Sequence, residues 1–416
     1  MVPASGLAGA RTAAGVVGAG GGVDRPTLRY DFRPGIPDLA TFPRAAWLRA
    51  TRTALSDLTD EQLSYQDSAG LWPLRQALAD YLGRVRGVVA SPDQVIVTNG
   101  FSQGLSLVAG ALARRAGLDG HPASDVVVGV EDPGSPGQRW LLDRAGLSVR
   151  AIPVDADGLV VPGPGPADLV EADRRPRGGA GGPAVQLAAL LVTPAHQFPT
   201  GVVMSAARRQ ALVGWARRTG GLIIEDDYDA EYRFDREPVG AVQGLAPDLV
   251  VYAGSTSKSL APGLRLGWLV APPSLVDDLA MAKATADLFT PAISQAAFAE
   301  LLRAGGFDRH LRRSRQLYRR RRDALDAAVR RYVPGAALGG IPAGLHAVVT
   351  LPASRTEHEV VERAAAASVR VYPMGSYRLE EVTDAPPALV LGYAPLTTSE
   401  ITDAIQLLAA AVARSA

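Results

Sequence analysis

Short apolar runs that alternate with helical segments restrict the fold of this 416-residue chain more than any other feature. Each run is rich in Val, Ile and Leu, and each is followed by a segment long enough to form a helix. Because two parallel strands need a crossover of a dozen or more residues, this alternation predicts a largely parallel sheet covered by helices on both faces. The runs lie at 95–99, 126–130, 187–193, 221–226, 249–254 and 266–272, and the helical segments at 102–116, 136–145, 205–219 and 274–288.

The length of the chain predicts more than one domain, since 416 residues exceed what a single core usually supports. We expect a disordered Ala/Gly-rich tail at 1–27, a large α/β domain at 28–290 and a smaller α+β domain at 291–416. Residues 161–186 are rich in Pro, Gly and Arg and lack periodicity, which predicts a surface insertion. An arginine-dense helix is expected at 309–325, where interleaved leucines favour an apolar stripe over a nucleic-acid-binding face.

The composition excludes several classes of function. The chain has no cysteine, so disulfides, thiolate metal sites and cysteine nucleophiles are excluded. The five histidines show no metal-ligand spacing, and we expect no metal. A formal net charge of +1 gives no global reason to expect nucleic acid. We find no run of about 20 apolar residues and no secretory leader, which predicts a cytoplasmic protein without a membrane partner.

The segment VYAGSTSKSLAPGLRLGW places Lys258 among small hydroxyl residues, with Arg265 seven positions later. A lysine amine condenses with an aldehyde only when it is partly deprotonated, and an arginine can fork onto a phosphate. Arginine forms no such imine at ordinary pH, and Lys258 and Lys283 are the only lysines in the chain. An exposed polar turn is the alternative interpretation of this segment alone. The hydroxyls that could assist are those of Ser255 and Ser257.

A second segment, QVIVTNGFSQGLSL, predicts a strand that ends at a helix N-terminus. Free backbone N–H groups and the positive end of the helix dipole meet there, and a phosphate binds well at such a point. Any strand-to-helix turn of an α/β protein could look similar. The candidate residues are Gly100, Phe101, Ser102 and Gln103.

A third segment, LIIEDDYDAEYRF, predicts a buried strand that ends in three carboxylates and a tyrosine. A pyridinium nitrogen keeps its proton beside a carboxylate, and we assign this role to Asp226, with Tyr228 donating to the ring hydroxylate. The loop TPAHQFPTG adds His196 and Gln197 as residues that could contact the cofactor ring. The alternatives are a solvated strand end and a structural histidine.

Eight segments occur in an order typical of one family: YQDSAGLWPLRQAL, TNGFSQGL, EDPGSPG, TPAHQFPTG, EDDYDAEY, STSKSLAPGLRLGW, GLHAVV and LVLGYAPL. From about residue 30 to its end, the chain resembles the aminotransferase-like domain of MocR-type regulators of the GntR family and the related fold-type I aminotransferases. The resemblance implies a fold-type I α/β architecture, with a mainly parallel sheet in the large domain and a smaller α+β C-terminal domain. It also implies pyridoxal 5'-phosphate as the cofactor.

The same resemblance implies roles for individual residues. Lys258 would form the internal aldimine, Asp226 would pair with the pyridine nitrogen, and Tyr228 would contact the ring hydroxyl. Ser255, Arg265 and the turn 100–103 would hold the phosphate. Tyr65 would reach the phosphate of a neighbouring subunit, which implies a homodimer with shared active sites.

The sequence departs from the family pattern at three points, which concern the residues around the cofactor and substrate and the DNA-binding domain of the regulators. Ser135 stands where relatives place an aromatic ring over the cofactor, and Trp140 could compensate. Val390 stands where many aminotransferases have an arginine for the substrate carboxylate, and Arg139 or Arg378 could substitute. Only the Ala/Gly tail precedes the catalytic-type domain, where MocR-type regulators begin with a winged helix. The candidate substrate-binding residues are Ser135, Arg139 and Arg378.

Three functions follow from these observations. The first is a PLP-dependent enzyme that acts on an amino acid or amine through Lys258, most simply an aminotransferase. The second keeps the cofactor but catalyses elimination, replacement or C–C bond formation. The third is a non-catalytic, effector-binding relative of the regulators. We expect no specific DNA binding, because the tail supplies no element that could enter a groove.

Overall fold

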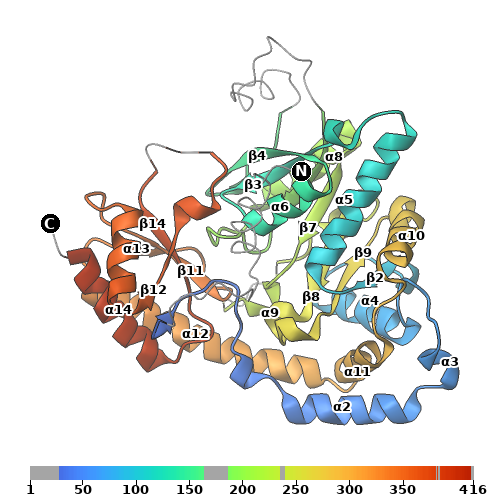
Figure 1. Ribbon diagram of the computed structural model, residues 1–416, viewed down its shortest axis with the longest axis horizontal. Helices are drawn as coiled ribbons and strands as arrows, with labels where there is room; N and C mark the ends of the chain where they lie inside the picture. The colour runs from blue at the N-terminus through green and yellow to red at the C-terminus, as the bar shows by residue number, and fades with distance from the viewer. Residues whose placement is uncertain (1–27, 164–185, 235–238, 381, 383–384, 414–416) are drawn as a thin grey trace, which may run out of the picture.

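The structure, a computed structural model, describes residues 28–163, 186–234, 239–380, 382 and 385–413. The tail predicted at 1–27 and nearly all of the insertion predicted at 161–186 lie outside the described residues. The domain boundaries given above stay a prediction. Figure 1 shows a large region built on one sheet and a smaller region formed by the C-terminal part of the chain.

The large region contains an eight-stranded sheet, in the order β2-β9-β8-β7-β6-β3-β4-β5. The pairs from β8 through β7, β6 and β3 to β4 are parallel, whereas β9 is antiparallel to both of its neighbours. The mostly parallel α/β sheet predicted from the sequence is thereby confirmed. The strands are β2 (Val95–Thr98), β3 (Val127–Asp132), β4 (Ser148–Asp155), β5 (Gly158–Leu159), β6 (Leu187–Val192), β7 (Leu222–Asp226), β8 (Val250–Ser255) and β9 (Gly267–Val270).

Two packed cores cover the two faces of this sheet. Side chains alternate along a strand, so Ile223 and its register partner Val250 pack into one core, while the next pair, Ile224 and Val251, packs into the other. Residues of α5 (Phe101–Leu118), α6 (Pro136–Arg144) and α10 (Val276–Asp287) belong to one of these cores, and residues of α8 (Ala206–Thr219) belong to the other. Helix α4 (Trp72–Arg86) packs into a further core that reaches into the smaller region.

A four-stranded antiparallel sheet, in the order β10-β11-β14-β13, forms the centre of the smaller region. The short strand β1 (Tyr30–Asp31) pairs in parallel with β12 (Val369–Arg370). The other strands are β10 (Ala337–Gly339), β11 (His346–Thr350), β13 (Tyr372–Pro373) and β14 (Ala388–Gly392). The remaining helices are α2 (Arg44–Asp57), α3 (Asp60–Leu63), α9 (Thr256–Ser259), α11 (Ala292–Arg303), α12 (Gly306–Tyr332), α13 (Glu357–Ala366) and α14 (Thr398–Ala413).

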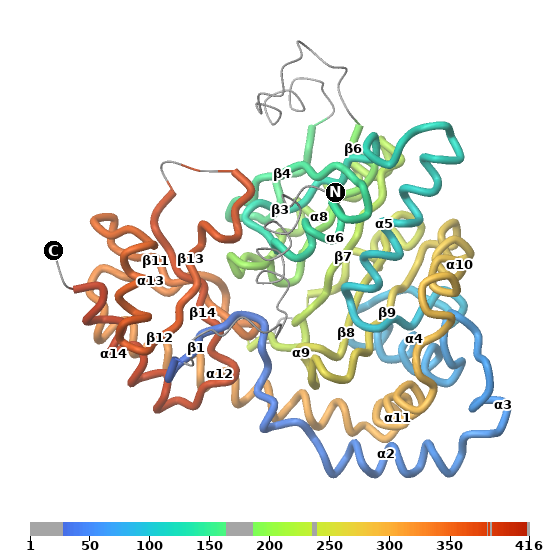
Figure 2. The backbone as a smooth tube through the Cα atoms, in the orientation of Figure 1, coloured from blue at the N-terminus to red at the C-terminus, as the bar shows by residue number. Residues whose placement is uncertain are grey.

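The N-terminal segment connects the two regions. After β1 the blue tube of Figure 2 leaves the small region, passes near α9 and enters α2, which packs against α11. Asp38 anchors this crossing, because its carboxylate lies 2.8 Å from the Arg321 guanidinium and its backbone N–H donates to the Tyr318 hydroxyl at 2.9 Å. The segment is therefore fixed against α12 on its way to the large region.

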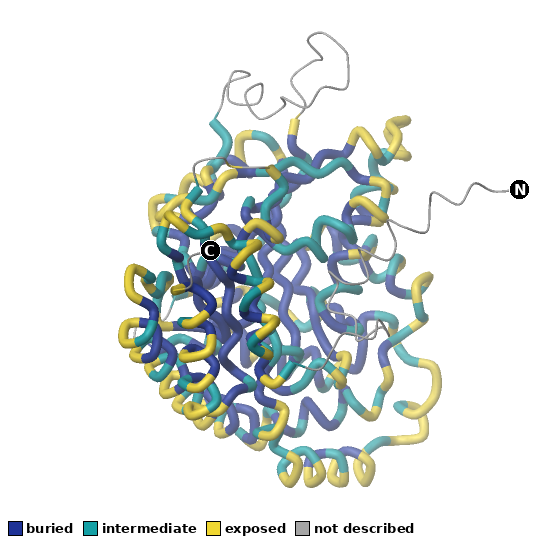
Figure 3. Tube along the Cα trace, turned by 60° about the vertical axis from the view of Figure 1, so that its left-hand side comes forward, coloured by how far each residue is buried: buried dark blue, intermediate teal, exposed yellow. Residues whose placement is uncertain are grey.

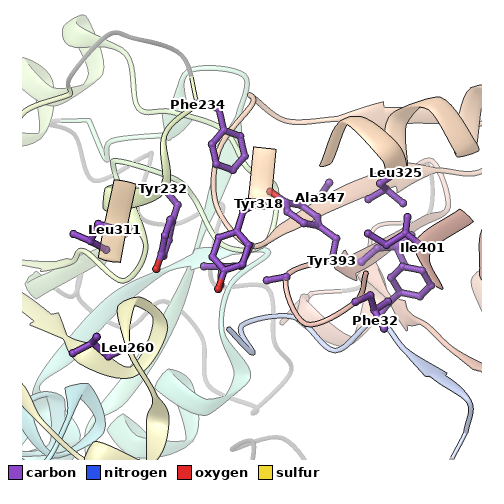
Figure 4. Close-up of a cluster of buried hydrophobic side chains, with 14 of the residues drawn as sticks. Phe32, Tyr232, Phe234, Leu260, Leu311, Tyr318, Leu325, Ala347, Tyr393 and Ile401 are labelled. Carbon is purple, nitrogen blue, oxygen red and sulfur yellow. The ribbon is translucent and has the colours of Figure 1, made fainter. Parts of the chain in front are cut away.

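The long helix α12 contains the arginine-dense segment 309–325, and its apolar side chains face the interior. Leu311, Tyr318 and Leu325 are buried, and the ring of Tyr318 lies 4.9 Å from that of Tyr232 (Figure 4). The apolar stripe predicted for this helix is confirmed. Exposed residues follow the outer turns of the helices in Figure 3, whereas the strands are buried. Within the described part of the chain, no helix has the length and apolarity that a membrane crossing requires.

Candidate active site

Lys258 lies in the short helix α9, directly after strand β8, and its amine approaches the N-terminal segment. A Cβ atom added to Gly35, where φ is +75°, would lie 3.2 Å from the Lys258 Nζ. Desolvation lowers the pKa of Lys258, and the positive charges of Arg33 and Arg265 act in the same direction, against Asp226 and Asp229. An amine with a lowered pKa is more often deprotonated, which is what attack on a carbonyl requires.

Arg265 and the start of α5 form an anion cradle. The Arg265 Nη2 donates to the Asn99 carbonyl at 2.5 Å, and a Cβ atom on Gly100 would lie 3.0 Å from the same nitrogen. A side chain at position 100, where φ is +84°, would strain the backbone and crowd the guanidinium, so glycine suits this position. The first N–H groups of a helix have no intrahelical partner, so those of α5 point at the space beside Arg265.

The second lysine of the chain belongs to a different cluster. Lys283 is buried and pairs with Asp287, which also accepts from the Asn99 side chain at 2.6 Å and from Gln103 Nε2 at 2.7 Å. Gln103 is thereby turned away from the cradle, whereas Ser102 and Phe101 stay partly exposed at the first turn. This arrangement favours Lys258 over Lys283 as the cofactor lysine.

Two of the three carboxylates at the end of β7 have structural partners. Glu225 accepts from the backbone N–H groups of Val242 and Gln243, each at 2.9 Å. Asp227 accepts from Arg86 Nε at 2.7 Å and from the Tyr252 hydroxyl at 2.6 Å. These residues tie β7 to its neighbours, which leaves the carboxylate between them for the site.

Asp226 points away from those partners, as alternation along a strand requires. Its Oδ2 accepts from Gln138 Nε2 at 2.6 Å, a contact with α6 that the sequence did not reveal. Desolvation raises the pKa of Asp226 well above its usual range, and the charge of Asp227 adds to this effect. A buried carboxylate of this kind gains from a cationic partner, such as a protonated ring nitrogen.

Tyr228, His196 and Asp229 form a chain of contacts beside Asp226. The Tyr228 hydroxyl lies 3.1 Å from His196 Nδ1, and the same nitrogen lies 2.9 Å from the Asp229 carboxylate. The His346 ring lies tilted against that of His196, with centroids 5.1 Å apart, and burial lowers the pKa of His346 to about 3. His196, Asp229 and His346 offer ligand atoms within 4.8 Å of one another, a grouping that the sequence spacing did not predict.

The His196 contacts have a consequence for proton position. Its Nδ1 donates to Asp229 when it carries a proton and accepts from Tyr228 when it does not, so it cannot satisfy both partners at once. A change in the hydrogen bonding of the Tyr228 hydroxyl is thus transmitted to Asp229. This coupling suits a residue that contacts the ring hydroxyl of a cofactor.

Gln197 is placed differently from His196. Its Nε2 donates to the carbonyls of Pro133 at 2.9 Å and Phe198 at 2.7 Å, and its Oε1 accepts from the Thr200 hydroxyl at 2.6 Å. The side chain is buried and both ends of the amide are engaged. In the structure Gln197 holds two loops together and has no free group to offer a ring.

The substrate candidates are only partly brought together. Ser135 occupies the N-cap of α6, and Arg139 donates to the Tyr377 carbonyl at 2.9 Å and lies 3.7 Å from Asp132. Arg378 lines a hollow next to β4, along with Asp132. Val390 is fully buried in β14. The structure adds Arg33 and Gly35 to the site, which sequence reasoning missed because nothing in the strand–helix alternation marks the N-terminal segment.

Tyr65 lies at the surface of the described chain. Its side chain is 85% exposed and meets the edge of Phe289, with ring centroids 6.2 Å apart. Tyr65 lies between α3 and α4, and its ring contact within the described chain is with Phe289 and not with a residue of the Lys258 site.

Comparison with known proteins agrees with this geometry. Residues 182–408 match the family model of aminotransferase class I and II. The chain belongs to this family. The pyridoxine biosynthesis transcriptional regulator PdxR of Corynebacterium glutamicum is 34% identical over 85% of this chain and 70% of its own length. The probable rhizopine catabolism regulatory protein MocR of Rhizobium meliloti is 31% identical over 92% of this chain and 72% of its own length.

A solved structure extends the comparison to an enzyme of this family. The α-aminoadipate aminotransferase LysN of Thermus thermophilus, complexed with N-(5'-phosphopyridoxyl)-L-leucine, matches with a TM-score of 0.78 and 27% identity over 96% of each chain. Members of the aminotransferase class I and II family use pyridoxal 5'-phosphate, and the present residues fit it. The cradle at Gly100 suits the phosphate, Asp226 the ring nitrogen and Lys258 the aldehyde. Pyridoxal 5'-phosphate is therefore the cofactor of this chain.

Proposed function

We propose that the chain is an aminotransferase that acts on an amino acid or amine, with pyridoxal 5'-phosphate held by Lys258. The observation that supports this most directly is the convergence of three groups from separate elements. Lys258 comes from α9, Asp226 from the end of β7, and the anion cradle from Arg265 and α5. Each group meets one chemical requirement of the cofactor: Lys258 that of the aldehyde, Asp226 that of the ring nitrogen, and the cradle that of the phosphate.

When bound, the cofactor supplies a positively charged ring that accepts electrons from a substrate carbanion. Asp226 keeps the ring nitrogen protonated, because a buried carboxylate favours the charged form of a neighbouring base. The Lys258 amine would take the proton from the substrate α-carbon and return it to the carbon of the former cofactor aldehyde, a task that its lowered pKa suits. Arg265 and the first turn of α5 fix the phosphate, and Tyr228 orients the ring through its hydroxyl.

A screen of amino donors tests this proposal. The purified protein is loaded with pyridoxal 5'-phosphate and mixed with each amino acid or amine, and the visible absorbance of the bound cofactor is followed with the release of oxo acid. We expect at least one donor to change the absorbance and to yield its oxo acid. Ammonia release or a coupled product would instead support elimination, replacement or C–C bond formation.

A second candidate function is supported by the regulator relatives. A chain that binds the cofactor and an amino acid without turnover would act as an effector-binding module, the role implied by its similarity to PdxR and MocR. The same screen separates the two functions, because such a module changes the absorbance but forms no oxo acid. A DNA footprint at a defined site that survives physiological salt would also support the regulator.

We further propose a homodimer in which Tyr65 completes the neighbouring site. Its 85% exposure in the single chain supports this. Lys258→Ala and Tyr65→Ala homodimers are each expected to be weakly active. Mixed dimers should regain activity, because one of their two sites contains both wild-type residues. The measurement is the oxo-acid rate after the two variants are unfolded and refolded together.

Refolding each variant alone is the control for the mixing experiment. At random exchange, half of the dimers are mixed and each carries one intact site, so about a quarter of wild-type activity is expected. A monomer in light scattering, or a mixture no more active than its components, would contradict the shared site.

A further inference from the structure

The position where many aminotransferases carry a carboxylate-binding arginine is apolar in this chain. Val390 is fully buried in β14 and pairs in register with Val348 and Tyr372. Its neighbours Met374 and Tyr377 belong to the same apolar cluster, with Phe198 packed against it. The side chain at position 390 therefore offers a substrate carboxylate no cation.

The N-terminal segment passes over the end of this same strand. Phe32 donates its N–H to the Arg370 carbonyl at 3.0 Å, and its carbonyl accepts from the N–H of Gly392 at 2.8 Å. A Cβ atom on Gly392 would overlap the carbonyl of Arg33. Gly35, two residues after Arg33, lies against the Lys258 amine. Arg33 is thus held between the end of β14 and the cofactor lysine.

The guanidinium of Arg33 is unengaged within the described chain. No hydrogen bond or ion pair joins it to another described residue, although it is partly buried. Of the other arginines of the site, Arg139 donates to the Tyr377 carbonyl and Arg265 to the Asn99 carbonyl. A partly buried guanidinium without a partner is costly, which favours an anionic ligand at this place.

The charge of Arg33 lowers the pKa of residues on both sides of the substrate space. It helps to lower the pKa of Lys258, after the larger effect of desolvation. It also acts on Tyr377 and on Tyr372, where it opposes the rise in the pKa that burial causes. The guanidinium therefore lies within electrostatic reach of the cofactor lysine and of the cluster around Val390.

We propose that Arg33 binds the carboxylate of the substrate, in place of the arginine that is absent at position 390. This inference rests on the proposed function and narrows it, because it selects amino acids over simple amines. A guanidinium binds a carboxylate through two parallel N–H···O bonds, which fixes the orientation as well as the position of the substrate. The cation comes from the N-terminal segment rather than from the C-terminal strand.

Binding of non-reacting carboxylates to the loaded protein tests this inference without relying on turnover. The probes are hydrocinnamate, isocaproate and glutarate, each compared with its neutral amide, and binding is measured by calorimetry and by the visible absorbance of the cofactor. We expect wild type to bind at least one carboxylate and not its amide. Arg33→Met should weaken that binding by about 10- to 100-fold, because a charge-assisted pair is lost.

Two further variants serve as a comparison and as a control for Arg33→Met. Arg33→Lys retains the positive charge but cannot form two parallel hydrogen bonds, so we expect an intermediate loss of carboxylate affinity. Arg52→Met removes an exposed arginine of α2, outside the site, and we expect no change. Unaltered circular dichroism and cofactor content in Arg33→Met would exclude a folding defect. If wild type binds no carboxylate, or if Arg33→Met binds it as well as wild type does, the inference is overturned.

These experiments distinguish failure of the Arg33 inference from failure of the proposed aminotransferase function. Carboxylate binding that depends on Arg33, in a protein that forms no oxo acid from any donor, would leave this inference in place and overturn the aminotransferase proposal. Transamination of an amino acid with the same KM and kcat in Arg33→Met as in wild type would overturn this inference and leave the aminotransferase proposal in place. For an amino acid and its decarboxylated amine, we expect only the kcat/KM of the amino acid to fall.

Discussion

Lys258→Ala is expected to reduce oxo-acid formation on the order of ten-thousandfold, since a positioned proton-transfer group alone contributes up to about 10⁴-fold. The variant also loses the amine that lies beside Gly35. The measurement is a single-turnover assay with excess protein, using a donor identified in the screen. Borohydride reduction of the wild type followed by peptide mapping should find the cofactor on Lys258.

Lys283 provides the internal control for that experiment. It is fully buried, and its amine is paired with Asp287. Lys283→Ala leaves a carboxylate without its cation, so we expect a loss of thermal stability and retention of the covalent cofactor. A reduced label on Lys283, or full activity in Lys258→Ala, would contradict the assignment.

Asp226→Asn is expected to keep the cofactor bound but to lower kcat on the order of a thousandfold, which is about 4 kcal/mol at roughly 1.4 kcal/mol per factor of ten. A neutral amide no longer favours a protonated ring nitrogen, so the ring withdraws electrons less well. The measurement combines kcat with the absorbance spectrum of the bound cofactor. The Gln138 contact does not replace the lost charge, because an amide is neutral.

Asp227→Asn is the matched control, since it makes the same change one position along the chain. Asp227 is the buried partner of Arg86, and breaking a buried pair costs about 3–5 kcal/mol. We therefore expect a lower midpoint of thermal unfolding, with kcat per loaded site nearly retained. If Asp227→Asn loses catalysis and Asp226→Asn does not, the two roles are reversed.

The sequence predicted the fold well where the apolar runs were continuous. Strands β2, β3, β6, β7, β8 and β9 correspond to such runs, and the mostly parallel sheet followed from their spacing. Strand β4, which reads SVRAIPVD, was not predicted. Most of its residues are only partly buried, so it lacks the continuous apolar run of a central strand. The antiparallel pairing of β9 with both neighbours also leaves no mark in the pattern.

The candidate site was predictable where its residues follow a strand end. Lys258, Asp226 and the turn at Gly100 each stand directly after an apolar run, where parallel strands bring side chains to a common edge. Gln138, His346 and Arg33 were missed because each reaches the site through tertiary packing. Gln197 was predicted from its motif to contact the cofactor ring. The motif does not reveal that both ends of its amide are hydrogen-bonded to loop residues.

The parallel pair β1–β12 makes the assembly of the site depend on the order of synthesis. Tyr30 leaves the ribosome early, yet its partner Val369 emerges only after more than 300 further residues, on the order of half a minute later at about 5–20 residues per second. Until then the eight-stranded sheet, with Lys258, Asp226 and the cradle, can form while β1 lacks its partner strand. A newborn chain can therefore complete the sheet that carries these residues before the strand next to Arg33 is paired.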